Sequence, residues 1–218
     1  MVSFLFIAAL WPIATSFALP CAEQPSTPGM TCHDLPQPDG TFGSILINDR
    51  LRARNLSDVH SETAVMVTRR DGDPPHFQRA GKSAEVCGEP SYYFHEWEQP
   101  QFADCDAIEQ WAISNNGLWI LSEEDQPASP ASIVLYQVNT CAFSVVMDPE
   151  TKTQGVSIGN IDVAAILQEQ LHDGYTQTGA RGTMECNFNT GSGHMLMRWW
   201  IATPSTAQDV PDLHGLTN

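Results

Sequence analysis

Positive charge is scarce in this chain of 218 residues. Ten lysines and arginines face 26 aspartates and glutamates, the formal net charge is −16 at pH 7, and lysine occurs only at positions 82 and 152. Such a surface repels the phosphate backbone of nucleic acids and anionic lipid headgroups. We therefore expect no nucleic-acid partner and no electrostatic docking to membranes. The acidity favours solubility in a mildly acidic extracellular fluid.

Long hydrophobic runs are missing beyond the N-terminus. Residues 1–18, MVSFLFIAALWPIATSFA, are apolar and uncharged and end in Ser16 and Ala18, small residues of the kind that signal peptidase accepts before its cut. A membrane anchor is the alternative, but the run is short for a span and Pro12 interrupts it. We predict a signal peptide that is cut after Ala18, and hence a secreted, extracellular protein without a membrane span.

The chain also lacks C-x-x-C pairs, so neither a zinc site nor a thioredoxin-like redox motif is indicated. In a secreted protein an even set of cysteines favours disulfides, and six cysteines leave fifteen pairings open. We expect Cys21 and Cys32 to close a small loop. For the others we consider Cys141 with Cys186, worth about 4 kcal/mol in loop entropy, and Cys87 with Cys105, worth about 3 kcal/mol. All of these bonds look structural.

Periodic segments are few before residue 84. Residues 19–46 are rich in Pro, Gly, Ser and Thr, and residues 71–84 read DGDPPHFQRAGKSA, a run of turn-forming residues. We predict an extension or pro-segment over 19–84, a domain over 85–203, and a flexible C-terminal tail over 204–218.

Two modification sites are predicted within the extension. The dibasic pair Arg69-Arg70 suggests that a secretory protease releases residues 19–70 as a pro-segment; the alternative is two arginines on an ordinary strand or loop. Asn55, in NLS, is an acceptor for N-glycosylation, which agrees with export and surface exposure.

The second half of the chain has the pattern of an α+β domain. Asp104 is a candidate cap for a helix over 105–116, whose inner face carries Cys105 and Ile108 and whose outer face carries Asp106 and Glu109. A second helix begins at residue 160 or 162 and stops at residue 174. Strand-like runs occupy residues 118–121, 132–138, 141–146, 182–188 and 194–202. We predict an antiparallel sheet of about four to five strands with both helices on one face.

Catalytic motifs are absent as well. Ser192 in TGSGH has the wrong spacing for a G-x-S-x-G elbow and belongs to a turn, and His95-Glu96 does not continue to an H-E-x-x-H motif. The carboxylate pairs Glu96/Glu98 and Asp104/Asp106 could in principle serve a glycosidase, but in so acidic a chain such pairs are expected by chance. We predict no catalytic residue, metal site or cofactor, and no enzyme activity.

Three further residues were considered for other roles. His172 lies near the end of the second helix, where the negative pole of the helix dipole stabilises a protonated imidazole. We therefore expect it to cap the helix rather than to bind a metal. Trp199 and Trp200 put one indole on each face of a strand, so one belongs to the core. The other is a candidate for an exposed partner- or sugar-binding surface, the alternative being that it packs under the N-terminal extension.

Five motifs, in this order, give the chain a resemblance to a known family: CGEP (87–90), ADCDAI (103–108), NTCAF (139–143), IGNIDVAAIL (158–167) and GARGTMEC (179–186). Over residues 87 to about 202 the chain resembles the fungal extracellular protein two effector domain, also known as the "putative necrosis-inducing factor" family. The resemblance implies a secreted fungal virulence protein that acts on host tissue or on rival microbes, with no enzymatic activity assigned to the domain.

The extension over 19–86 and the strong acidity go beyond the family's pattern, so function carries over less securely than fold. We expect a monomeric, non-catalytic effector that binds a host-plant or competitor-microbe target. The alternative is a secreted antimicrobial or killer-type toxin, a disulfide-braced α/β sandwich. A third hypothesis is a wall-associated carbohydrate-binding module, and the least favoured hypothesis is a hydrolase.

Overall fold

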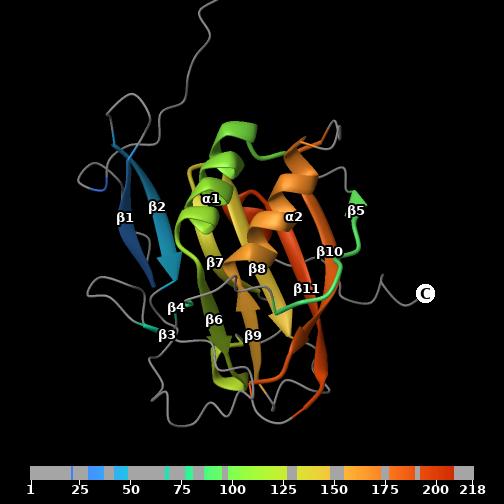
Figure 1. Cartoon of the computed structure of the whole chain (residues 1–218). Coiled ribbons are helices and arrows are strands. Elements are labelled where there is room, and N and C mark those ends of the chain that lie inside the picture. Colours follow the sequence, from blue (N-terminus) through green and yellow to red (C-terminus); the bar gives the residue numbers. More distant parts are fainter. Residues whose placement is uncertain are drawn as a thin grey trace, which may run out of the picture.

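The computed structural model describes residues 21, 29–36, 42–48, 67–68, 77–80, 86–94, 98–126, 132–147, 155–172, 177–189 and 192–208. Two helices lie side by side across one face of a large sheet (Figure 1). The predicted α+β class is confirmed. The strands are more numerous than the four to five predicted: among the described residues there are two sheets, and the larger one alone has seven strands.

The larger sheet has seven strands in the order β1-β2-β7-β8-β11-β10-β5, and each neighbouring pair is antiparallel. Its strands are β1 (Met30–Pro36), β2 (Phe42–Asn48), β7 (Ile133–Val138), β8 (Cys141–Met147), β11 (His194–Ala202), β10 (Ala180–Asn187) and β5 (Tyr93–Phe94). Strand β8 is buried along its whole length, and β10 alternates between buried and more exposed positions. The centre of the sheet is therefore core, and β10 keeps one face toward the surface.

The smaller sheet has four strands, in the order β3-β4-β6-β9. They are β3 (Val67–Thr68), β4 (Phe77–Ala80), β6 (Gly117–Leu121) and β9 (Val156–Gly159). An isolated bridge between Val156 and Phe188 joins this sheet to the end of β10. Strand β9 was not predicted from the sequence. It leads directly into the second helix and so fixes where that helix begins.

The two helices are α1 (Phe102–Ser114) and α2 (Asn160–His172). Both cover the sheet face formed by β7, β8 and β11 (Figure 1). Fully buried Ile108 of α1 and Leu167 of α2 belong to the same core as Phe143 of β8. The predicted start of the second helix at residue 160 is confirmed.

The predicted capping role of Asp104 is wrong. Helix α1 begins three residues earlier than expected, with Gln101 at its N-cap position and no side-chain cap, so Asp104 lies inside the first turn. There its carboxylate faces the link between β7 and β8 instead of the free N–H groups of the helix.

Part of the segment predicted as an extension is built into the larger sheet. Strand β2 pairs with β7, the side-chain amide of Asn48 donates to the Val134 carbonyl at 2.9 Å, and Ile45 and Ile47 are fully buried in the main core. Cys21 and Cys32 form the predicted disulfide next to β1. Arg69, Arg70, Asn55 and Ala18 lie outside the described residues, so cleavage and glycosylation stay predictions.

The C-terminal tail also contributes structure, which differs from the prediction of a flexible segment. Residues Pro204–Gln208 form the short helix α3, and Ala207 is buried. Thr203 precedes this helix and its carbonyl accepts the Ala207 N–H at 2.8 Å, while Pro204 stands at the first helical position, which proline favours. Ser132 donates to the Ala207 carbonyl and so attaches α3 to the start of β7.

The remaining four cysteines form the bonds Cys105–Cys141 and Cys87–Cys186. The pairing of Cys141 with Cys186 is therefore wrong, and so is that of Cys87 with Cys105. Strand β11 lies between β8 and β10. Their backbones are about 9–10 Å apart, whereas the Cα atoms of a disulfide lie within about 7 Å. Observed Cα–Cα distances are 5.3 Å for Cys105–Cys141 and 4.0 Å for Cys87–Cys186.

A buried polar chain connects the helices to both sheets. The indole N–H of Trp119 in β6 donates to the Tyr136 hydroxyl in β7, and that hydroxyl donates to the side-chain carbonyl of Asn160 at the start of α2. Asn160 in turn donates to the Asn115 carbonyl after α1. Trp119, Tyr136 and Asn160 are each fully buried, and burial raises the pKa of the Tyr136 hydroxyl above its ordinary value.

We expect Tyr136→Phe to lower the free energy of unfolding by about 1–3 kcal/mol, because it removes both the acceptor for the Trp119 indole and the donor to Asn160 inside the core. Chemical denaturation under non-reducing conditions measures this. The control is Tyr93→Phe, since Tyr93 is 44% exposed, and its effect should stay within about 0.5 kcal/mol. Equal effects of the two substitutions would contradict a stabilising role for the hydrogen bonds of Tyr136 with Trp119 and Asn160.

Candidate functional site

Two of the family-like motifs meet at the Cys105–Cys141 bond. Beside it, the Asp104 carboxylate accepts hydrogen bonds from the Thr140 backbone N–H at 3.1 Å, the Thr140 hydroxyl at 2.6 Å and the Asn139 side-chain amide at 3.1 Å. Asp104 is 2% exposed. Asn139 has a φ of 41°, so the turn between β7 and β8 uses a left-handed residue. A disulfide and a buried carboxylate thus hold α1 to this turn together.

Three other motifs meet in the same way at the Cys87–Cys186 bond. The Asp162 carboxylate accepts the backbone N–H groups of Val86 and Cys87 at 3.1 and 3.3 Å, and that of Gly159 at 2.7 Å. Accepting the Gly159 N–H is one half of a capping box at the start of α2. The segment before β5 is therefore held by Asp162 on one side and by the disulfide to β10 on the other.

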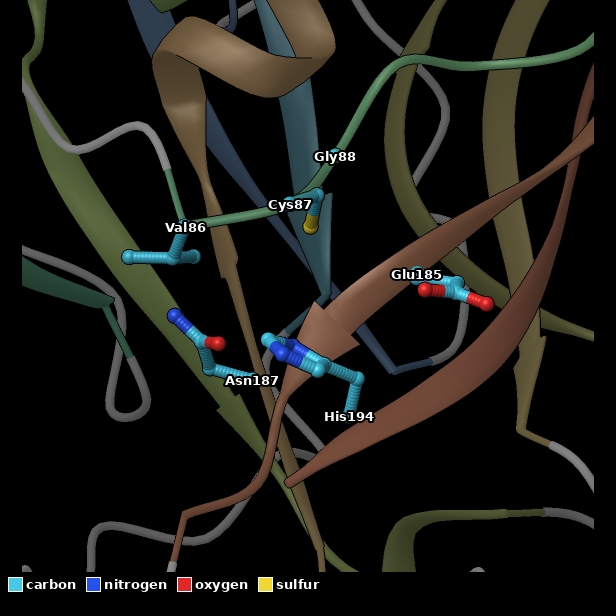
Figure 2. Close-up of a pocket in the computed structure, with 6 residues that line it drawn as sticks. All are labelled: Val86, Cys87, Gly88, Glu185, Asn187 and His194. Carbon is cyan, nitrogen blue, oxygen red and sulfur yellow. The ribbon is translucent and has the colours of Figure 1, made fainter. Parts of the chain in front are cut away.

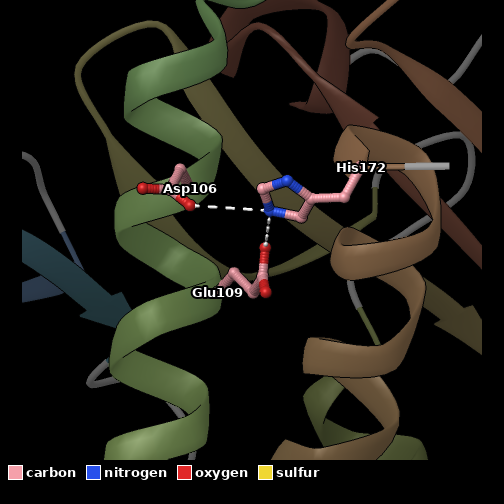
Figure 3. Close-up of side chains that lie close together, drawn as sticks. All are labelled: Asp106, Glu109 and His172. Atoms are coloured by element: carbon pink, nitrogen blue, oxygen red, sulfur yellow. Dashed lines mark hydrogen bonds and ion pairs between the residues drawn. The ribbon is translucent and has the colours of Figure 1, made fainter. Parts of the chain in front are cut away.

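These contacts assign a structural role to the motifs that carry the resemblance. Both aspartates accept several hydrogen bonds from segments distant in sequence, and both lie next to a disulfide. Local sequence rules missed this because each aspartate stands near a helix start, where capping is the usual interpretation. Asp104 and Asp106 do not face each other across a cleft: Asp104 bonds to the β7–β8 turn, and Asp106 points toward α2 (Figure 3).

The predicted exposed indole is wrong. Trp199 is fully buried and lies edge-on against Tyr92, with ring centroids 5.1 Å apart, and Trp200 is only 3% exposed. The alternation along β11 does place them on opposite faces, but both faces are covered at this end of the strand. Neither indole offers a binding surface in the structure.

The exposed part of the same strand pair lies at its other end. Glu185 and Asn187 of β10 are exposed, as are His194 and Leu196 of β11, and Leu196 is 42% exposed. Glu185 pairs with Leu196 and Asn187 pairs with His194, so the four side chains share one face of the sheet. We call these four residues the outer ladder. Sequence reasoning chose the wrong end of β11 because it weighed aromatic content rather than which end is covered.

A hollow of about 350 Å³ opens beside the outer ladder and is lined by Val86, Cys87, Gly88, Glu185, Asn187 and His194 (Figure 2). Its rim is rigid, because Gly88 donates to the Glu185 carbonyl at 2.7 Å and Asn187 donates to the Val86 carbonyl at 3.2 Å. A volume of this size lies at the low end of small-molecule sites, which span about 300–1,000 Å³. A carboxylate, an amide and an imidazole give it donors and acceptors of hydrogen bonds.

A second group of chemically active side chains joins the two helices. His172, in the last turn of α2, points toward Asp106 and Glu109 of α1 (Figure 3). Its Nε2 atom lies 3.1 Å from Glu109 Oε2 and 3.8 Å from Asp106 Oδ1. The sequence pattern predicts both acids on the polar outer face of the first helix and a helix-dipole cap for His172, whereas Glu109 is buried in the structure. Nothing local to either helix indicates that the three meet.

Burial raises the pKa of the Glu109 carboxyl above its usual range. The hydrogen bond and positive charge of His172 act against this rise, and the neighbouring Asp106 carboxylate adds to it. Glu109 is only 3% exposed, which is uncommon for a glutamate without a full ionic partner.

Three other candidate residues of the sequence remain to be placed. His95 and Glu96 lie outside the described residues, and Ser192 lies in the bend before β11. Among the helices of the described ranges, none has the length and apolar character needed to cross a bilayer.

Fold and bonds together define a disulfide-braced α+β domain. Residues 86–186 match the Hce2 family model, described as "pathogen effector; putative necrosis-inducing factor". The matched segment begins one residue before Cys87 and ends at Cys186, so the Cys87–Cys186 bond joins its two ends. The resemblance predicted from the motifs is confirmed. A search of curated proteins finds no match to the chain.

We expect Asp162→Asn to lower the free energy of unfolding by about 2–3 kcal/mol, because an amide presents only one acceptor oxygen and turns its own donors toward the N–H groups. Amide hydrogen exchange at Val86 and Cys87 should become faster than in the wild type. Glu185→Gln makes the same chemical change on an exposed residue and should alter stability by no more than about 0.5 kcal/mol. Equal stability of the two variants would show that Asp162 does not hold the segment.

Proposed function

We propose that this protein is a secreted effector that binds a host or microbial target through the outer ladder and its adjoining hollow, without catalysis. The single observation that carries the effector role is the match of residues 86–186 to a family of pathogen effectors. The disulfides agree with export, because such bonds form and persist in oxidising surroundings.

The outer ladder supports recognition for three reasons. It stands on paired strands rather than on a loop, so its side chains are held in place before a partner arrives. Exposed Leu196 offers an apolar contact, and Glu185, Asn187 and His194 offer hydrogen bonds around it. Cys186, which is bonded to Cys87, stands between Glu185 and Asn187 in β10 itself. We infer that the target presents hydrogen-bond donors to Glu185 next to an apolar group that covers Leu196.

We expect Leu196→Ala to raise the dose of purified protein that causes cell death in infiltrated leaf tissue by about tenfold, since truncating a central apolar contact typically costs more than 1 kcal/mol of binding. The matched control is Ile113→Ala on α1, because Ile113 is 48% exposed and lies away from the ladder. Its dose should stay within about twofold of the wild type. Melting curves confirm that both variants fold.

The same assay separates the alternatives. Equal doses for both variants and the wild type would contradict the outer ladder as the binding surface. Growth inhibition of fungi or bacteria without leaf necrosis would replace the effector role with that of an antimicrobial or killer-type toxin. Inactivity of the folded wild type in both assays would contradict the proposed function as a whole.

A further inference from the structure

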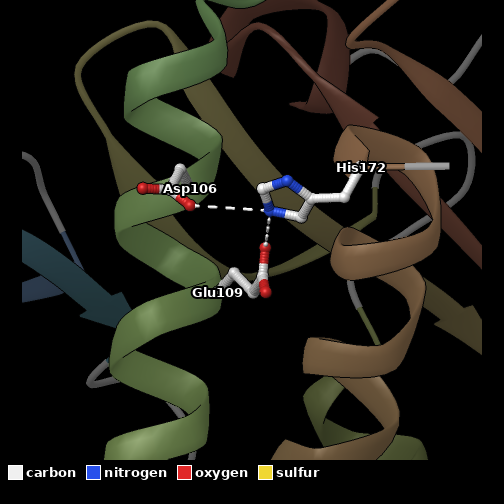
Figure 4. Close-up of polar contacts among 3 residues, drawn as sticks. All are labelled: Asp106, Glu109 and His172. Carbon is white, nitrogen blue, oxygen red and sulfur yellow. Dashed lines mark hydrogen bonds and ion pairs between the residues drawn. The ribbon is translucent and has the colours of Figure 1, made fainter. Parts of the chain in front are cut away.

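The group formed by Asp106, Glu109 and His172 has the composition and spacing of a metal site. Its three candidate ligand atoms, one imidazole nitrogen and two carboxylate oxygens, all lie within 4.8 Å of one another. They come from two different helices, and their side chains point toward one another between these helices (Figure 4).

The distances fit the coordination shell of a small divalent ion. Zinc bonds to nitrogen and oxygen are about 2.0–2.2 Å long, so tetrahedral ligand atoms are separated by roughly 3.3–3.6 Å. Separations of 3.1 Å from His172 Nε2 to Glu109 and 3.8 Å to Asp106 lie on either side of that range. Asp106 is half-buried, and a shift of its carboxylate toward His172 by a few tenths of an ångström brings the longer separation into this range.

The donor set selects among metal ions. An imidazole nitrogen with carboxylate oxygens suits zinc and other transition metals, whereas Ca²⁺ takes six to eight oxygens and Mg²⁺ prefers oxygens and water. Catalytic-type zinc sites use three protein ligands and leave a fourth position for water. His172 and Asp106 have side-chain exposures of 44% and 37%, so the open position here faces solvent.

The burial of Glu109 adds to the case for a cation. Its side chain is almost fully buried, and within the described residues the hydrogen bonds of its carboxylate consist of the one contact with His172. In the same part of the chain, the ion pairs of Asp106 and Glu109 are with His172 alone. With both carboxyl groups ionised and the imidazole neutral, the group carries two negative charges, which a bound divalent ion would balance.

The imidazole is also oriented for ligation. Phe102, in the first turn of α1, packs edge-on against the His172 ring, with centroids 5.6 Å apart and an interplanar angle of 86°. This contact restrains the ring plane while its Nε2 atom points at the two carboxylates (Figure 4). Phe102 is 47% exposed, and its contact with His172 covers part of its apolar ring.

We propose that Asp106, Glu109 and His172 bind one divalent transition-metal ion of the Zn²⁺ class, which clamps α1 to the last turn of α2. The ion joins residues 63 positions apart in the sequence, between α1 and the end of α2. Its open position takes a water molecule. This site is separate from the outer ladder, and the proposal does not depend on the effector role.

Calorimetric titration of the metal-free, oxidised protein with ZnCl₂ tests the proposal. We expect one ion per chain and, at a hundredfold excess over Kd, a rise in Tm of about 5–10 °C that EDTA reverses. His172→Ala and Glu109→Gln should each lower the affinity at least about tenfold, since each removes a ligand. MgCl₂ at the same concentration should leave Tm unchanged.

The matched control is His194→Ala, which removes an exposed imidazole of the outer ladder and should bind Zn²⁺ like the wild type. Replacing Zn²⁺ by Co²⁺ gives a visible absorption spectrum that reports the coordination geometry, and His172→Ala should abolish it. Absence of Zn²⁺ binding by the wild type would overturn the proposal and leave a plain histidine–carboxylate bridge. Equal binding by wild type and His172→Ala would overturn it too, because the ion would then sit elsewhere.

Discussion

The fold depends on two disulfides that each work together with a buried aspartate. Cys105–Cys141 and Asp104 hold α1 to the turn between β7 and β8, and Cys87–Cys186 and Asp162 hold the segment before β5 to α2 and β10. With sequence separations of 36 and 99 between the partners, the bonds contribute about 4 and 5 kcal/mol in the loop-entropy model. Net stabilities of domains are only about 5–15 kcal/mol. The aspartates then fix the local geometry that the bonds alone leave free.

This arrangement explains why the family motifs predict fold better than target. Their cysteines, together with Asp104 and Asp162, are engaged in contacts within the domain, whereas the four outer-ladder residues, two from β10 and two from β11, are exposed. The Asp106–Glu109–His172 group is likewise outside the bracing contacts. Similar folds can present different surfaces, so the motifs carry less information about a target than about the fold.

The local sequence pattern predicted most helices and strands of the second half of the chain. The disulfide pairing and the contacts between helices depend on the tertiary arrangement and were not predicted. Alternation in residues 194–202 gave β11 within its observed bounds. The disulfide pairing was out of reach because loop entropies differ by only about 1 kcal/mol between alternatives, whereas the position of β11 between β8 and β10 excludes Cys141–Cys186 outright. Strand β2 was missed because Pro- and Gly-rich sequence surrounds it, although Ile45 and Ile47 alternate as a strand should. The metal-like group was missed because its members come from separate helices.

The most direct test of this account is disulfide mapping of the purified protein by peptide analysis without reduction. The structure predicts three linked peptides, containing Cys21–Cys32, Cys87–Cys186 and Cys105–Cys141. A peptide that links Cys141 to Cys186, or free thiols at these positions in active material, would contradict the disulfide-braced fold on which the outer ladder and the proposed metal site both depend.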